Sequence, residues 1–265
     1  MNKNLCRSTM VVLLIAALGS VSMGQTTSSE PETYSRLSLS LGGYYYSGNL
    51  NQVQGNLQGH YGLSSPTNGV DVLFNGYRLW SKANKDAGFK VVGDDAYVTA
   101  LPFWYLSDEV YLAGLARYES SRIQRLNTRY IGGAGVGYAP VRTKSFLIRM
   151  SIIPTFEYAT FDGEDFRIDV THDGPNRQVA RTAFLSNGWY RVEATAVTFR
   201  YFGQLWMSPK ELKDFRANLT GNMDIKITAP LAFRTTINLN HDSAILVGRE
   251  PTDIRSTFGF VWTSQ

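Results

Sequence analysis

The sequence predicts an all-β protein whose strands close into one antiparallel barrel, and three observations support this. Polar and apolar residues alternate along many segments, as over 214–227 (DFRANLTGNMDIKI), which gives a strand one dry face and one wet face. Beyond residue 35, no stretch of comparable length holds the 3.6-residue period of an amphipathic helix. Short and long joins alternate between the segments. We therefore expect hairpins with short turns at one end of the barrel and long loops at the other.

The first 24 residues predict a signal peptide that directs export. Two basic residues precede a run of nine apolar residues, MVVLLIAAL at 10–18, and small and polar residues follow. That order is typical of a secretory signal, and nine apolar residues are too few to span a bilayer. The polar segment 25–34 predicts a disordered lead-in. We therefore expect a cleaved signal over 1–24 and a single barrel domain over 35–265.

Composition excludes several classes of protein. Cys6 is the single cysteine and lies in the predicted signal, so the exported chain would have no disulfide. Without the two basic residues of the signal, 24 basic residues remain against 22 acidic ones. Such a small excess gives no reason to expect a nucleic-acid partner. No segment predicts a cofactor site, and we expect no cofactor.

Alternation and turn residues place twelve strands along the chain. The first six are expected at 35–46, 50–62, 69–80, 94–106, 109–119 and 128–139. Over 50–62, polar residues at even positions alternate with Val53, Leu57 and Tyr61. Within 128–139, no helix follows the run GGAGVG to bind a phosphate, so its glycines predict bending and close packing of a strand. The short joins SSPTNG and SDE follow the second and fourth strands.

The last six strands are expected at 145–160, 177–185, 189–206, 213–227, 231–241 and 253–262. In 145–160 and 231–241, charged and polar residues alternate with large apolar ones. The strand at 177–185 makes the count even, and SNG after it predicts a tight hairpin because Asn-Gly suits positive φ. An even count, with short turns on one side and mostly long loops on the other, is typical of an outer-membrane barrel.

The strands distinguish a membrane barrel from a soluble β-sandwich. At about 3.3 Å per residue, the strand at 214–227 would extend roughly 46 Å, longer than most strands of globular proteins. A sandwich would hide its apolar faces between two sheets and would need no systematic difference between loops. The aromatic groups at 44–46, 103–105 and 258–262 fit girdles at the two membrane interfaces. We therefore expect a transmembrane barrel of the outer-membrane type whose apolar face contacts lipid.

Three segments carry a resemblance to a known family. They are YSGNLN at 46–51, RYESSRIQRLNTRYIGGAGVGY at 117–138, and NHDS at 240–243 followed by Asp253. In these segments the chain resembles the salt-induced outer-membrane protein family, a domain of unknown function. The resemblance implies a β-barrel in the bacterial outer membrane, with outer-membrane lipid and the barrel assembly machinery as partners, and it assigns no activity. The chain departs from the aromatic C-terminus usual in such barrels, because 263–265 follow Trp262.

The polar face of the strands predicts the lining of the lumen. Parity along the strands turns these charged residues inward: Arg149, Glu157, Arg191, Glu193, Arg216, Asp224, Lys226, Arg234 and Arg255. Opposite charges interleaved in this way either line a narrow pore or pair across a closed lumen. We expect a narrow pore for ions or small solutes, linked to salt or osmotic stress. The alternative is a closed barrel with a structural or stress-response role and no transport.

Two residues near the end of the eleventh strand support a third hypothesis. His241 and Ser243 lie two apart on the lipid-facing side, and they resemble the His-x-Ser of outer-membrane phospholipases and lipid A deacylases. Such a serine needs a further group to orient its histidine, and no neighbouring residue is well placed for this. A turn in which Asp242 and Ser243 bond to the backbone accounts for the same residues. We therefore expect no enzyme, with a lipid-ester hydrolase as the competing hypothesis.

Acidic residues gather in the loop 162–173, DGEDFRIDVTHD. Carboxylate oxygens at this density suit calcium, but the spacing of an EF-hand is absent. We interpret the loop as solvated and leave cation binding there open. His60 lies among glutamines and asparagines, which predicts a hydrogen-bonded lining residue rather than a metal ligand. We expect no metal site.

Overall fold

Twelve β-strands make up most of the described part of the chain. The computed structural model describes residues 34–46, 51–82, 88–143, 145–166, 168, 170, 172–192 and 195–264. The strands are β1 (Tyr34–Tyr46), β2 (Asn51–Ser64), β3 (Asn68–Lys82), β4 (Lys90–Tyr105), β5 (Val110–Ser121), β6 (Leu126–Arg142), β7 (Phe146–Phe161), β8 (Asn176–Arg191), β9 (Val197–Met207), β10 (Phe215–Lys226), β11 (Leu231–Asp242) and β12 (Thr252–Thr263). Among the described residues there is no helix long and apolar enough to span a membrane.

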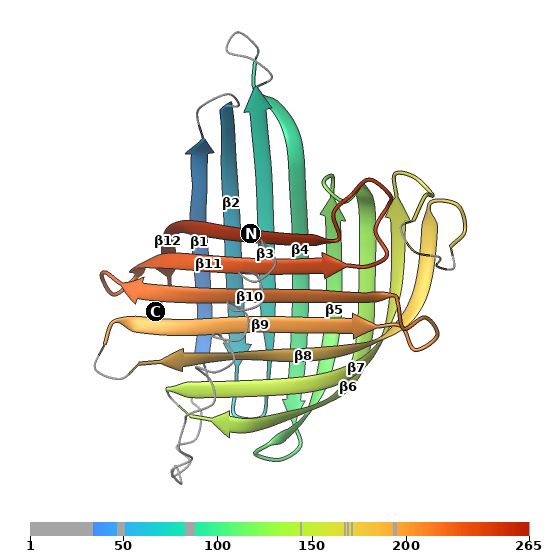
Figure 1. Cartoon of the computed structure of the whole chain (residues 1–265). Coiled ribbons are helices and arrows are strands. Elements are labelled where there is room, and N and C mark those ends of the chain that lie inside the picture. Colours follow the sequence, from blue (N-terminus) through green and yellow to red (C-terminus); the bar gives the residue numbers. More distant parts are fainter. Residues whose placement is uncertain are drawn as a thin grey trace, which may run out of the picture.

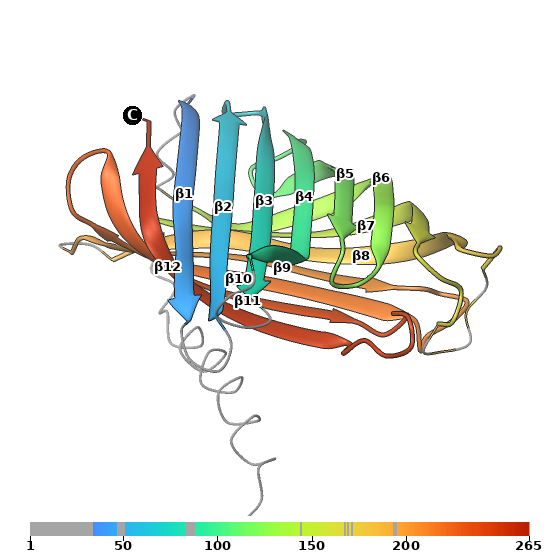
Figure 2. The same cartoon turned by 90° about the horizontal axis from the view of Figure 1, so that it is seen from above.

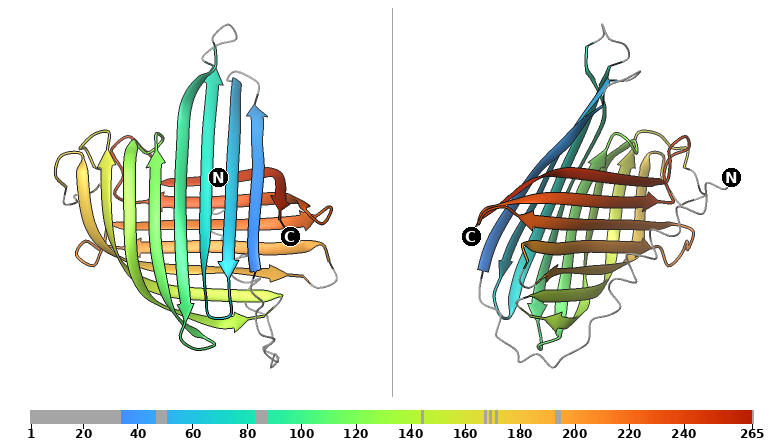
Figure 3. Two further views of the ribbon diagram at one scale, coloured as in Figure 1. Left: turned by 180° about the vertical axis from the view of Figure 1, so that it is seen from behind. Right: turned by 60° about the vertical axis from the view of Figure 1, so that its left-hand side comes forward.

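The strands close into one barrel (Figures 1 and 2). Each strand pairs antiparallel with the next along the chain, and β12 returns to pair with β1, for example Phe260 with Leu41. Strands on one side of the barrel cross those on the other, as Figure 3 shows from two further directions, because closing a twisted sheet tilts its strands. The closing pair joins Ser38–Gly42 of β1 to Gly259–Thr263 of β12. The prediction of a single antiparallel barrel of twelve strands is confirmed.

The two ends of the barrel differ in their connections. At one end, termed the turn end, the joins at 65–67, 106–109, 143–145, 192–196 and 227–230 are three to five residues long. At the opposite end, termed the loop end, the joins at 47–50, 83–89, 122–125, 162–175, 208–214 and 243–251 are four to fourteen residues long. Because β1 begins and β12 finishes at the turn end, both ends of the strand order lie on that side. This asymmetry is typical of outer-membrane barrels.

The eighth hairpin differs from the sequence prediction. β8 runs without a break through Ser186-Asn187-Gly188, the segment expected to be a turn, and the chain turns at 192–196 instead. A Cβ atom on Gly188 would lie 2.2 Å from the carbonyl oxygen of Leu147, so this glycine is needed for the close approach of β7 and β8. The predicted boundaries at 177–185 and 189–206 are therefore wrong, although the number of strands is unchanged.

The outer face of the barrel is apolar. Large hydrophobic side chains remain exposed around it: Leu41, Leu57, Val98, Leu112, Val136, Phe156, Phe184, Leu205, Leu219, Ile237 and Ile254. Residues between them on each strand face the lumen, and many of those buried residues are polar or charged. A soluble β-sandwich would bury the apolar set, so the sandwich alternative is wrong. The distribution matches a barrel whose outside meets hydrocarbon.

The aromatic residues near the turn end divide between the two faces. Trp104 is 61% exposed on the outside, whereas Phe103 is buried in the core and Tyr105 packs against that core. Strand alternation forces this division, so the expectation of a girdle is wrong for Phe103 and Tyr105. The aromatic residues within 258–262 all lie on the outer face. The side chains at 44–46 lie outside the described part of the structure.

Candidate functional site

The inner face of the barrel is the candidate site, and its two sides differ. The side formed by β1–β3 and β10–β12 presents buried amide and hydroxyl groups: Ser38, Ser40, Gln54, Asn56, Gln58, Asn218, Thr220, Thr236, Asn238 and Thr257. The side formed by β4–β9 presents an apolar cluster in its middle and charged residues toward both ends. Both linings follow from strand alternation, because every second residue faces the lumen.

Trp206 belongs to the apolar cluster and is only 1% exposed. The buried members of the cluster are Phe103, Tyr111, Ala113, Leu115, Ile131, Ala139, Ile153, Ala183, Leu185, Phe202 and Trp206. Glycines let their strands come close: a Cβ atom on Gly135 would lie 2.1 Å from the carbonyl oxygen of Ile152. At this level, side chains rather than water fill the β4–β9 side of the lumen.

A group of arginines and carboxylates, termed the lumen network, lies on the loop-end side of this cluster. It consists of Arg117, Arg129, Arg177, Arg181, Arg216, Glu119, Glu157, Asp214 and Asp242. Arg129 is 1% exposed and contacts Glu119, Glu157 at 3.1 Å and Asp242 at 3.0 Å. Glu157 is fully buried and also lies 3.0 Å from Arg181. Arg129 and Glu157 thus each face several opposite charges, which offsets the cost of removing ions from water.

Several of these ion pairs cross the lumen. Arg129 projects from β6 and Asp242 from β11, and these two strands lie nearly opposite each other in the closed order. Arg216 of β10 reaches Glu119 of β5 at 3.2 Å, again between opposite walls. Direct contact between opposite walls leaves no room for a wide water-filled channel at this level.

Two further groups of ion pairs lie toward the turn end. Asp71 of β3 pairs with Arg149 of β7 across the lumen, and it also lies 2.9 Å from Nε2 of His60. Asp224 pairs with Arg234 at 2.6 Å and also with Arg200 of β9. Charge pairing therefore recurs on both sides of the apolar cluster.

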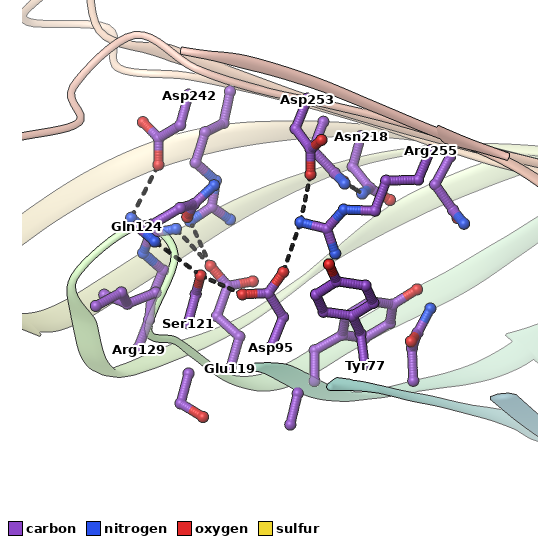
Figure 4. A pocket seen from close by; sticks show the side chains of 18 of the residues that line it. Tyr77, Asp95, Glu119, Ser121, Gln124, Arg129, Asn218, Asp242, Asp253 and Arg255 are labelled. Carbon is purple, nitrogen blue, oxygen red and sulfur yellow. Dashed lines mark hydrogen bonds and ion pairs between the residues drawn. The ribbon is translucent and has the colours of Figure 1, made fainter. Parts of the chain in front are cut away.

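A cavity of about 100 Å³, termed the loop-end cavity, lies beside the lumen network (Figure 4). On one wall, Arg255 contacts Asp253 and lies 2.7 Å from Asp95, and its guanidinium is 4.2 Å from the ring centre of Tyr77. Five charged residues of the lumen network form the other wall: Arg117, Glu119, Arg129, Arg216 and Asp242. Amides complete the lining: Gln54, Asn56, Asn75, Asn218, Asn238 and Asn240. A space of this size holds several water molecules or one small polar molecule.

The strand pairing determines where the charged residues expected in the lumen lie. Five are buried in ion pairs on the inner face: Arg149, Glu157, Arg216, Asp224 and Arg234. Arg255 is half-buried at the loop-end cavity. Arg191 and Lys226 are exposed at the turn-end limits of β8 and β10. Glu193 lies outside the described residues.

Sequence reasoning missed several members of the lumen network, notably Arg129, Arg177 and Arg181. On β8, the inward positions mix Arg177 and Arg181 with Val179 and Ala183, because the strand lines both the network and the apolar cluster. A mixed inner face hides the alternation on which the assignment depends. The signal that could have found Arg129 is the alternation along β6, in which its neighbour Tyr130 faces outward and Arg129 therefore faces the lumen.

His241 and Ser243 do not form a nucleophile–base pair in the structure. The hydroxyl of Ser243 donates to the carbonyl oxygen of Phe215 at 2.9 Å and accepts from its amide at 2.8 Å. The His241 ring stacks on the Phe215 ring at 4.8 Å, and its Nδ1 lies 2.9 Å from the Thr252 hydroxyl. Ser243 therefore fastens the β11–β12 loop to the start of β10, and its hydroxyl is not directed at a base.

The acidic loop makes local contacts in its described part. Asp162 lies 3.6 Å from Arg125, and Nδ1 of His172 lies 2.9 Å from the carbonyl oxygen of Gly174. Asp169 is outside the described residues. Across the described part of the chain, no group of three or more His, Cys, Asp or Glu residues could hold a metal ion.

The family model described as "Protein of unknown function, DUF481" matches residues 38–263, nearly the whole barrel. The chain belongs to this family. The expected membership of an uncharacterised family is thus confirmed, and the match carries no information about induction by salt. No curated protein matches this DUF481 member.

Solved structures of porins and of an autotransporter domain resemble this DUF481 barrel distantly. The NanC porin is 12% identical with a TM-score of 0.46, and the match covers 86% of this chain and 100% of that one. The translocator domain of the autotransporter NalP from Neisseria meningitidis is 11% identical with a TM-score of 0.43, covering 97% and 96%. The KdgM porin is 7% identical with a TM-score of 0.39, covering 86% and 99%. The barrel assignment depends on the strand pairing of this chain and not on these likenesses.

Replacing Glu157 by glutamine tests whether the lumen network stabilises the barrel. The change leaves Arg129, Arg181 and Arg216 without a shared, fully buried carboxylate. We expect the free energy of unfolding to fall by about 3–5 kcal/mol, because uncompensated buried charge is costly. Urea unfolding of the refolded protein in detergent measures it.

Asp162→Asn is the matched control, since Asp162 is exposed and its pair with Arg125 is a surface pair. We expect this change to cost less than about 1 kcal/mol. Equal effects of the two substitutions would contradict a stabilising role for the network.

Proposed function

We propose that the protein is a bacterial outer-membrane barrel that passes ions or small polar solutes and is closed in the observed conformation. The apolar outer face supports a location in lipid, and the difference between turn end and loop end supports an orientation with the turn end toward the periplasm. The polar, charged inner face supports a role for polar cargo rather than an apolar one. A link to salt or osmotic stress is part of this proposal and rests on the family resemblance.

The observation that carries the proposal is how the lumen is closed. All twelve strands lie in the wall of the barrel, and the contacts between opposite walls are made by side chains such as Arg129–Asp242 and Arg216–Glu119. Side chains change rotamer far faster than a folded plug segment can leave. A passage beside the amide-lined wall then needs side-chain movement only, with the strand pairing intact.

A permanently closed barrel is the second candidate, and the apolar cluster favours it. Trp206 and its neighbours fill one side of the lumen, and the ion pairs on either side of them are buried. Buried pairs of this kind are weakly screened by salt, so ionic strength alone would not release them. Conductance distinguishes the two candidates.

The partners we propose are outer-membrane lipid and the barrel assembly machinery. The alternate aromatic residues Phe258, Phe260 and Trp262 of β12 lie exposed on the outer face. They supply the alternating aromatic end that such machinery would read, although 263–265 follow them.

Recording in planar bilayers tests the passage. We expect the wild type to give small, intermittent conductance steps, and Glu119→Gln with Asp242→Asn to increase them and favour anions, because unpaired arginines of the lumen network then face the passage. The same preparations are checked for a folded barrel by circular dichroism. Asp162→Asn serves as the control for loss of an acidic charge outside the lumen. Folded wild type and double variant that both lack conductance would move the assignment to the closed barrel.

We also propose that the protein is not a lipid-ester hydrolase. The backbone of Phe215 occupies both hydrogen-bonding roles of the Ser243 hydroxyl, which leaves it poorly prepared to act as a nucleophile. Purified protein should hydrolyse phospholipid no faster than Ser243→Ala does. Hydrolysis that disappears in Ser243→Ala, while the fold persists, would restore the hydrolase hypothesis.

A further inference from the structure

We propose that the loop-end cavity binds a small zwitterion, with its cationic group against Asp95 and Asp253 and its anionic group against Arg129 and Arg216. This deepens the proposed passage by naming its solute class, and it rests on that proposal for its physiological meaning. Three features of the cavity support this class of ligand: the charge of each wall, the neutral groups between the walls, and the size of the space.

The β12 side of the cavity carries excess negative charge. Asp95 and Asp253 share a single arginine, Arg255, which lies 2.7 Å from Asp95 and also contacts Asp253. Arg255 is fixed in this position by the face of Tyr77, 4.2 Å from its guanidinium (Figure 4). Two carboxylates against one guanidinium leave a place for one further cationic group.

The opposite wall carries excess positive charge. Of the residues that line the cavity there, Arg117, Arg129 and Arg216 face the carboxylates of Glu119 and Asp242. Behind this wall, Arg177 and Arg181 both pair with Asp214. Glu157 lies 3.0 Å from Arg181, and it also lies 3.1 Å from Arg129 and 3.5 Å from Arg216. The lining itself has three guanidiniums against two carboxylates, and among the described residues Nη2 of Arg216 has no hydrogen-bond partner, which leaves a place for one anionic group.

Neutral hydrogen-bonding groups connect the two walls. Gln54 of β2 and Asn218 of β10 both line the cavity and are 6% and 7% exposed. Among the described residues, the amide nitrogen of Gln54 and the amide oxygen of Asn218 have no hydrogen-bond partner. Buried amides are normally satisfied, so a donor and an acceptor left over at one cavity favour a polar occupant.

Size and net charge together select the class of ligand. The four arginines and four carboxylates that line the two walls sum to neutrality only when both walls are counted, so a single ion would leave one wall uncompensated. A space of about 100 Å³ admits a molecule of a few heavy atoms. A short chain with an ammonium at one end and a carboxylate at the other satisfies both limits.

Calorimetry with four probes tests the inference on the full chain, folded in detergent. The probes are β-alanine, propionate, propylamine and glycerol, each at the same ionic strength. We expect β-alanine to bind at least ten times more tightly than either singly charged probe, because it alone can make charge-assisted hydrogen bonds to both walls. β-Alanine that binds no more tightly than propionate or propylamine, or that does not bind, would overturn the proposal.

Asp253→Asn removes one carboxylate from a partly exposed position, so the barrel should tolerate it. We expect it to weaken β-alanine binding at least tenfold, whereas Asp162→Asn, with the same loss of charge on the acidic loop, leaves binding unchanged. Unaltered binding in Asp253→Asn would contradict the assigned position of the ammonium group. Because calorimetry needs no ion flow, absent binding beside intact conductance would reject the solute class and leave the passage standing.

Discussion

Pairing of buried arginines with carboxylates across the lumen is the interaction on which the rest of the structure depends. The outside of the barrel is apolar, and the inside holds guanidiniums as buried as Arg129 and a carboxylate as buried as Glu157. An ion in such a place is costly unless opposite charges surround it. The network meets that condition only when the barrel is closed, because Arg129 and Asp242 come from strands on opposite walls.

The same pairing sets the form of the lumen. The ion pairs draw β5 and β6 toward β10 and β11, while Trp206 and the apolar cluster fill the space on the β4–β9 side. A small open space lies between the lumen network and Arg255, where the charges of the two walls differ in sign. The arrangement thus produces a barrel with a narrow, polar and charge-divided interior, which is the property behind both functional proposals.

The sequence determined the fold in most respects, because alternation acts within single strands. Fourteen residues of strict period two at 214–227 correspond to β10, and the short and long joins predicted which connections share an end of the barrel. The eighth hairpin was misplaced because Asn187-Gly188 has the chemistry of a tight turn, whereas Gly188 serves the close approach of two strands. Local chemistry could not reveal that, since the neighbour that excludes a Cβ atom, Leu147, is distant in sequence.

The candidate site was less predictable, because its content lies in pairs between distant strands. Parity placed Arg216 and Glu157 on inner faces. Nothing in the sequence says that Glu157 contacts both Arg216 and Arg129. The loop-end cavity combines residues of β2–β6 and β9–β12, so its divided charge emerges only after closure.

The measurement that tests the central claim most directly is a double-mutant cycle between Arg129 and Asp242. Unfolding free energies of Arg129→Met, Asp242→Asn and the combined variant give the coupling across the lumen, and Arg129 with Asp224, which lies toward the opposite end of the barrel, gives the control pair. Contact across the lumen predicts a coupling of about 1–3 kcal/mol for Arg129 with Asp242 and additivity within about 0.5 kcal/mol for the control. Additivity of Arg129 and Asp242 in a folded barrel would contradict the account.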